Sequence, residues 1–137
     1  MAVDRLAWVV LRVAVAGLLA AHGWWRLLNG GVAPFGGWLA SQGLPAGPAV
    51  AWAITAIEIL ATPLLAAGRG VFPITLLLAP IYVAGIILVH AKEGWFVVGA
   101  GRNGMEYSVL LVVVLLVLAA HHAPARRGKP GRTEPPR

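Results

Sequence analysis

The sequence contains no cysteine among its 137 residues. It therefore carries no disulfide bond, no cysteine-bound iron–sulfur cluster and no thiol chemistry of its own. Charged residues are also scarce, because they make up 12% of the chain, compared with about 25% in soluble domains. Hydrophobic residues make up 59%, which is more than a soluble domain of this size can bury. These features predict a single domain for which lipid is the solvent over much of the surface.

The formal net charge of +6 does not indicate a nucleic-acid-binding protein. Five basic residues lie in the C-terminal tail with no aromatic residue between them: Arg126, Arg127, Lys129, Arg132 and Arg137. Basic residues that directly follow an apolar helix are typical of a cytoplasmic membrane face. We therefore expect residues 122–137 to form a disordered basic tail in the cytoplasm, and we expect no nucleic-acid partner.

Four apolar stretches have about the length needed to cross a bilayer: Leu6–Leu28, Pro48–Ala67, Val71–Ala91 and Gly104–His121. Each approaches the ~20 residues that span ~30 Å of hydrocarbon at about 1.5 Å per residue. Because backbone polar groups in lipid must be hydrogen-bonded within their own segment, these stretches predict helices. Residues 1–121 are therefore predicted to form an all-α bundle of four transmembrane helices.

The first apolar stretch is predicted to be a retained helix, since it contains Arg12 and is followed by bulky polar residues, unlike a cleaved signal peptide. Between the first two stretches, Pro34–Gln42 is short and apolar and contains Trp38, which predicts an interfacial or re-entrant helix. Lys and Arg near the helix ends favour a multi-pass protein of the inner (cytoplasmic) membrane with both termini in the cytoplasm.

Ionisable residues inside the predicted spans are costly to bury, so they are expected to face protein and to find partners. Counting about 1.5 Å per residue from the inner end of each helix places Arg12 about 9 Å deep and Glu58 about 13 Å deep. A long arginine side chain can cover this difference, so a structural Arg12–Glu58 ion pair is predicted. Such a pair can serve helix packing alone.

A second group of polar residues falls in the outer third of the predicted bundle: His22, Arg26, His90, Glu106 and Tyr107. One interpretation is an interfacial belt of aromatic and cationic side chains. The other is a polar pocket, open to the outer leaflet, in which two imidazoles and a carboxylate move protons. No His-x-x-x-His or Glu-x-x-His spacing is present, so no metal site is predicted.

A series of short motifs follows one order along most of the chain. The motifs are Arg12, His22-Gly23, Arg26-Leu27, Gly36-Gly37-Trp38-Leu39, Gly43-Leu44-Pro45, Glu58, His90, Gly94-Trp95-Phe96 and Glu106-Tyr107. From Arg5 to about Leu118, the chain resembles the DoxX family of small four-helix membrane proteins. That family is named after a thiosulfate:quinone oxidoreductase of archaea, and its members are linked to sulfur metabolism, oxidative-stress complexes and assembly or chaperone roles.

The protonatable residues and this resemblance together lead us to expect a redox-associated membrane protein with a pocket for a quinone or a similar small hydrophobic ligand. The expected ligand-binding residues are His22, Arg26, Glu58, His90, Glu106 and Tyr107. The chain departs from the family at two places. The family often has lysine at the position of Arg26, which keeps the charge but changes its geometry. The serine and aspartate that usually follow the fourth span are replaced by His121-His122-Ala123-Pro124.

The chain has no flavin fingerprint and no haem-ligation pattern, so a membrane-protein or soluble redox partner would supply the electrons. On this interpretation the chain is a subunit of a quinone-linked oxidoreductase. The alternative is a non-enzymatic assembly or scaffold subunit of a membrane complex, in which the polar residues only fix helix register. A small transporter is less favoured, because four helices leave little room for a pathway and no inverted repeat is visible. A homo-oligomer would remove that objection.

Overall fold

The computed structural model describes residues 2–98 and 103–124. Within these residues the chain forms α1 (Ala2–Leu28), α2 (Val32–Ser41), α3 (Gly47–Ala66), α4 (Val71–Leu88), the short 3-10 helix η1 (His90–Glu93) and α5 (Glu106–His121). Helices α1, α3 and α4 are long and apolar enough to cross a membrane, and α5 is a shorter apolar helix. The predicted all-α fold, with four membrane helices and a short helix between the first two, is confirmed. Residues 125–137 of the predicted tail lie outside the described residues.

The largest differences from the predicted helix boundaries are at the beginning of α1 and the end of α4. Helix α1 begins at Ala2 rather than Leu6, and α4 ends at Leu88 because the next residues turn into η1. The turn between α3 and α4 is short. Gly68 and Gly70 have φ angles of +76° and +60° there, in the left-handed region that glycine adopts without steric cost. This turn makes α3 and α4 run in opposite directions.

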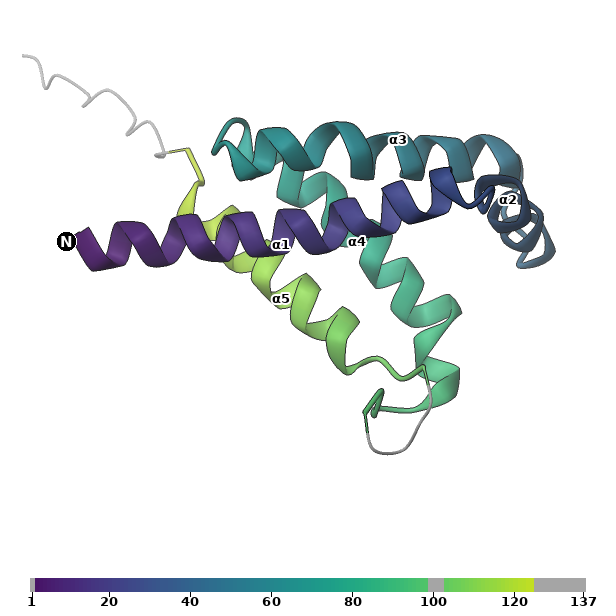
Figure 1. Cartoon of the computed structure of the whole chain (residues 1–137). Helices are drawn as coiled ribbons and strands as arrows, with labels where there is room; N and C mark the ends of the chain where they lie inside the picture. Colours follow the sequence, from purple (N-terminus) through teal and green to yellow (C-terminus); the bar gives the residue numbers. More distant parts are fainter. Residues whose placement is uncertain (1, 99–102, 125–137) are drawn as a thin grey trace, which may run out of the picture.

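The helices form two antiparallel pairs (Figure 1). Helices α1 and α3 lie side by side, with α2 across one end, and α4 packs mainly against α5. The α4–α5 pair diverges from α1 and α3 toward its connecting loop (Figure 1). At its other end α5 returns to the beginning of α1, where the rings of Trp8 and His121 stack with centroids 3.8 Å apart. The beginning of α1 and the end of α5 therefore lie on the same side of the bundle.

The main core lies toward the end at which α1 begins. Leu19 from α1, Leu65 from α3, Leu78 from α4, and Leu115 and Leu118 from α5 are fully buried there. Each of the four apolar helices therefore contributes leucine to one shared core, and dispersion contacts among them hold the bundle together. Beyond this core the two helix pairs separate.

Helix α2 is held against the beginning of α3 at the opposite end of the bundle. A Cβ atom at Gly36 would lie 2.6 Å from the Cα atom of Pro48, so only glycine permits this approach. A small second core of Val32, Leu39 and Ala51 lies between the two helices. This packing makes α2 a wall of the space that opens between the helix pairs.

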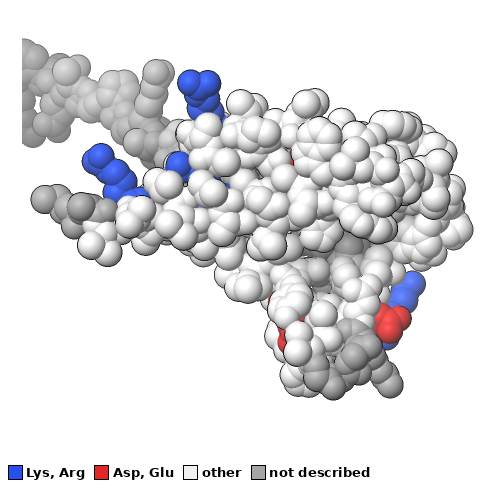
Figure 2. Space-filling view, viewed as in Figure 1, with Lys and Arg blue, Asp and Glu red and all other residues white. Residues whose placement is uncertain are grey.

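The outer surface is apolar between two charged ends. Leu60 on α3 and Ile87 on α4 are 69% and 63% exposed. Figure 2 shows Lys and Arg side chains gathered at the end where α1 begins and charged side chains again near the α4–α5 loop, with an almost uncharged band between them. An apolar band of this kind is suited to the hydrocarbon core of a bilayer. The chain is a multi-pass membrane protein.

Candidate functional site

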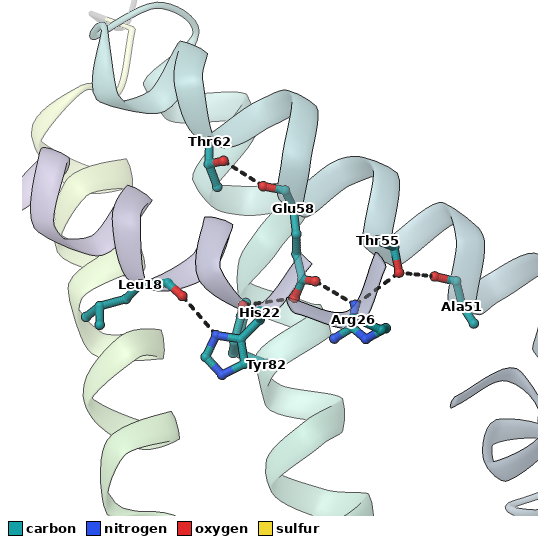
Figure 3. Close-up of polar contacts among 8 residues, drawn as sticks. All are labelled: Leu18, His22, Arg26, Ala51, Thr55, Glu58, Thr62 and Tyr82. Carbon is teal, nitrogen blue, oxygen red and sulfur yellow. Dashed lines mark hydrogen bonds and ion pairs between the residues drawn. The ribbon is translucent and has the colours of Figure 1, made fainter. Parts of the chain in front are cut away.

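Glu58 lies inside the bundle, on the face of α3 that meets α1 and α4, and is 2% exposed. Helix α1 can approach it because a glycine lies at the same level, where a Cβ atom at Gly23 would be 2.8 Å from that of Glu58. Both carboxylate oxygens accept hydrogen bonds (Figure 3). Arg26 donates from Nη1 to Oε2 at 2.7 Å, and the Tyr82 hydroxyl donates to Oε1 at 3.0 Å. The buried charge is therefore both paired and hydrogen-bonded, which is what its burial requires.

Two further contacts fix Arg26 beside this pair. Its Nη1 also donates to the Thr55 hydroxyl oxygen at 3.1 Å, and that hydroxyl donates in turn to the carbonyl of Ala51 (Figure 3). The guanidinium carbon lies 4.5 Å from the centroid of the Phe35 ring of α2, a cation–π contact. Residues from α1, α2, α3 and α4 thus converge on one ion pair.

The predicted Arg12–Glu58 ion pair is wrong, because Glu58 pairs with Arg26. Arg12 instead donates from Nε to the carbonyl of Ala66 at 3.2 Å, at the C-terminal end of α3, where unpaired carbonyls and the helix dipole favour a cation. The physical cause is the length of α1, which begins earlier than predicted and extends past the end of α3 (Figure 1). Arg12 therefore faces the end of α3, and the cation level with Glu58 is Arg26.

A cavity of about 610 Å³ lies between the two helix pairs, with α2 as a further wall. Five of the predicted ligand-binding residues line it: His22, Arg26, Glu58, His90 and Tyr107. Most of the remaining lining is leucine, isoleucine, valine and aromatic side chains. Small-molecule sites are typically concave, mostly apolar spaces of about 300–1,000 Å³ with a few polar groups. The cavity has these properties.

The two histidines of the cavity are held in the same way. His22 Nδ1 lies 2.9 Å from the carbonyl oxygen of Leu18, and His90 Nδ1 lies 2.9 Å from that of Asn103. Since a carbonyl oxygen only accepts, each Nδ1 must carry the hydrogen. Figure 3 shows the His22 ring beside Tyr82, with its second nitrogen directed away from Leu18. In the described part of the chain, neither Nε2 atom has a hydrogen-bond partner.

The cavity has no net charge apart from what its histidines can take up. Among the described lining residues, Arg26 is the only arginine or lysine and Glu58 is the only carboxylate. The two form an ion pair at 2.7 Å, so their charges neutralise each other. Each Nε2 atom can accept a hydrogen bond when the ring is neutral and donate one when the ring is protonated. The site can therefore bind a polar group of a ligand as donor or acceptor and exchange a proton with it.

Glu106 is the predicted site residue that the structure does not bring into this group. Its Oε1 accepts hydrogen bonds from the backbone N–H groups of Val97 and Val98 at 2.9 and 3.2 Å. The backbone N–H of Glu106 itself donates to the carbonyl of Trp95. The carboxylate thus ties the segment after η1 to the first turn of α5, whereas the next residue, Tyr107, lines the cavity.

Sequence reasoning missed both Thr55 and Tyr82, of which Tyr82 had the clearer signal in the sequence. The Tyr82 hydroxyl completes the hydrogen bonding of Glu58. One signal was available, because Tyr82 and Thr75 are the two residues with polar side chains in the α4 sequence. A buried tyrosine hydroxyl usually has a hydrogen-bond partner, so a tyrosine in the middle of an apolar span indicates a polar group on a neighbouring helix.

Comparison with known proteins agrees with this architecture. No curated protein and no solved structure matches the chain. The model of the DoxX family matches residues 7–91, which is more than half of the chain and extends from α1 to the beginning of η1. The match contains His22, Arg26, Glu58 and His90 and leaves α5 outside it. The chain belongs to the DoxX family.

Proposed function

We propose that the cavity binds a quinone or a similar small hydrophobic ligand and that the protein takes part in a redox-associated membrane process. The observation that carries this proposal is the pair of imidazoles whose Nδ1 atoms are fixed and whose Nε2 atoms are unpartnered, His22 and His90, in one largely apolar cavity. The neutralised Arg26–Glu58 pair lies in the same lining.

This arrangement suits the chemistry of a quinone. The apolar lining accommodates the ring, and a quinone carbonyl accepts a hydrogen bond from a protonated Nε2 atom or from Arg26. Reduction to the quinol takes up two electrons and two protons, after which the ring hydroxyls donate hydrogen bonds to a neutral Nε2 atom. Groups that can change between donor and acceptor are therefore useful to both forms of the ligand.

The electrons come from another protein or from a soluble donor in this proposal. The sequence carries no cysteine and neither a flavin fingerprint nor a haem-ligation pattern, so the chain contributes the binding site and the proton-exchanging groups. It then acts as one subunit of a quinone-linked system, with a membrane-protein or soluble redox partner.

We further propose that the protein lies in the cytoplasmic membrane with both termini in the cytoplasm. Arg12 lies at the end of α3 and close to Gly68, in the turn that also contains Arg69, on the same side as the beginning of α1. Arg26, which sequence counting assigns to the opposite side, is neutralised by Glu58. The excess of positive charge at the terminal side supports this orientation. A periplasmic signal from an alkaline phosphatase fused after residue 137 would contradict it.

Direct binding of decyl-benzoquinone to the purified protein in mild detergent tests the ligand proposal. We expect His22→Ala and Glu58→Gln to weaken binding by about tenfold or more. The first removes an imidazole from the cavity and the second removes the charge that holds Arg26, and each loss is worth about 1–2 kcal/mol. His121→Ala is the matched control, because His121 stacks on Trp8 and does not line the cavity. Glu93→Gln serves in the same way for the carboxylate, since Glu93 is exposed in η1.

Equal affinity in wild type, His22→Ala and Glu58→Gln would contradict the proposed pocket. If the protein also purified with a stoichiometric partner and no discrete small molecule, the alternative of an assembly or scaffold subunit would be favoured. In that case the Arg26–Glu58 pair would serve to fix the register of α1 against α3.

A further inference from the structure

The cavity opens sideways between α1 and α5. Leu18 and His22 lie one turn apart on α1, and Tyr107 and Leu110 lie about one turn apart on α5. All four line the cavity, and yet all four are exposed, with 57% for Leu18, 52% for Tyr107 and 59% for Leu110. A side chain can line a cavity and face the outside at once only where the cavity reaches the surface.

This opening has a closed end and an apolar rim. Toward the core it ends where Leu19 and Leu115 are fully buried. Leu18 and Leu110 lie within apolar helices, so the opening faces the hydrocarbon of the membrane. A polar or charged group at this rim would lose its hydration without gaining a partner, so whatever occupies the rim is apolar.

The charges inside the cavity determine which head group the ligand can have. Arg26 and Glu58 already neutralise each other, and among the described lining residues there is no second arginine or lysine to pair with an anionic head group. A cationic head group would therefore be a buried charge without a counter-ion, and an anionic head group would gain one only by protonation of His22 or His90, so burying a charged head is costly. An uncharged head that forms hydrogen bonds meets Nε2 of His22 and the remaining N–H groups of Arg26.

We propose that the ligand is an amphiphile with an uncharged ring-sized head and a single apolar tail. The head occupies the cavity beside His22 and Arg26, and the tail leaves between Leu18 and Leu110 into the bilayer. This inference rests on the proposed function and deepens it, because it names the class of ligand and the route of its tail. Phospholipids with an anionic head and compact ligands without a tail fall outside this class.

The absence of cysteine makes the tail route measurable. A single cysteine introduced by Leu110→Cys at the rim can carry a bimane fluorophore without any background labelling. The matched control is Val83→Cys on α4, which is exposed, lies outside the cavity lining, and sits at a similar depth when both helices are counted from the α4–α5 loop. The probe is an alkyl-benzoquinone with a nitroxide on its tail, added to the protein in lipid nanodiscs. The nitroxide-free compound corrects for quenching by the ring.

We expect nitroxide quenching to be several-fold stronger at the Leu110→Cys label than at the Val83→Cys label. Excess decyl-benzoquinone should abolish the difference, and so should His22→Ala. The anionic single-chain amphiphile decanoate should leave it unchanged.

Binding of the head is measured separately, by calorimetry with decyl-benzoquinone. If decyl-benzoquinone binds but the two labels are quenched equally, the tail route is overturned and the proposed function stands. If decanoate displaces the probe as well as decyl-benzoquinone does, the requirement for an uncharged head is overturned. If decyl-benzoquinone does not bind at all, both this inference and the proposed function are overturned.

Discussion

Replacing Glu58 with glutamine removes the negative charge opposite Arg26 and keeps the size of the side chain. Breaking a buried ion pair from one side costs about 3–5 kcal/mol, because the remaining charge loses its partner. The Arg26 side chain is 16% exposed, and a glutamine oxygen can still accept one hydrogen bond worth about 1 kcal/mol. We therefore expect Glu58→Gln to lower the free energy of unfolding by about 2–3 kcal/mol.

A double-mutant cycle separates the pair from its surroundings. With Arg26→Gln and Glu58→Gln, we expect a coupling energy of about 2 kcal/mol, since the double variant no longer leaves a charge unpaired. The same cycle with Arg12→Gln should be additive within about 0.5 kcal/mol, because Arg12 contacts Ala66 rather than Glu58. Both cycles can be measured by reversible unfolding in mixed detergent micelles, followed by tryptophan fluorescence. A coupling energy below about 0.5 kcal/mol for Arg26 and Glu58, or equal coupling in both cycles, would refute the assignment of the ion pair.

Three further predictions follow from individual contacts. Tyr82→Phe should lower the free energy of unfolding by about 1 kcal/mol, because it removes one hydrogen bond to Glu58 and leaves the ring in place; no change in unfolding would speak against that bond. Gly23→Ala should destabilise the protein by about 1–3 kcal/mol, because its Cβ atom would lie 2.8 Å from that of Glu58. Gly17→Ala should be nearly neutral, because nothing lies within 4 Å of its Cβ position. Equal effects of the two substitutions would contradict the close approach of α1 to α3. Glu106→Gln should speed hydrogen exchange at the backbone amides of Val97 and Val98, which donate to its carboxylate, with little change in ligand affinity. Unchanged exchange at these amides would contradict the two hydrogen bonds.

The helices could be predicted because the bilayer leaves few alternatives. Apolar stretches of about 20 residues must be helices in lipid, and the predicted second span Pro48–Ala67 differs from α3 by one residue at each end. The short helix at Pro34–Gln42 was also predicted, and it begins two residues earlier, at Val32. The beginning of α1 was not predictable in the same way. Polar residues Asp4 and Arg5 end the apolar run there but do not end the helix.

The site was predictable in composition but not in pairing. His22, Arg26, Glu58 and His90 were expected to approach one another, and the structure brings them to one cavity. Which arginine meets Glu58 depends on how far α1 extends past α3, and a shift of a few residues along a helix decides it. Sequence spacing within one helix carries no information about that offset.

Glu106 shows a second limit of sequence reasoning. It is adjacent to Tyr107, which lines the cavity, yet neighbouring residues on a helix point in different directions. Its carboxylate therefore meets the backbone amides of the preceding loop. The sequence placed Glu106 at the beginning of α5, but the direction of its side chain around the helix axis was not predictable.

Mass spectrometry of the small molecules that co-purify with the protein from its native membrane, in mild detergent, tests the central claim most directly. We predict one discrete compound with an uncharged ring and a single apolar tail, retained by the wild type and by His121→Ala and lost from His22→Ala. Only bulk phospholipid, present in the same amount in all three proteins, would contradict the account of the cavity.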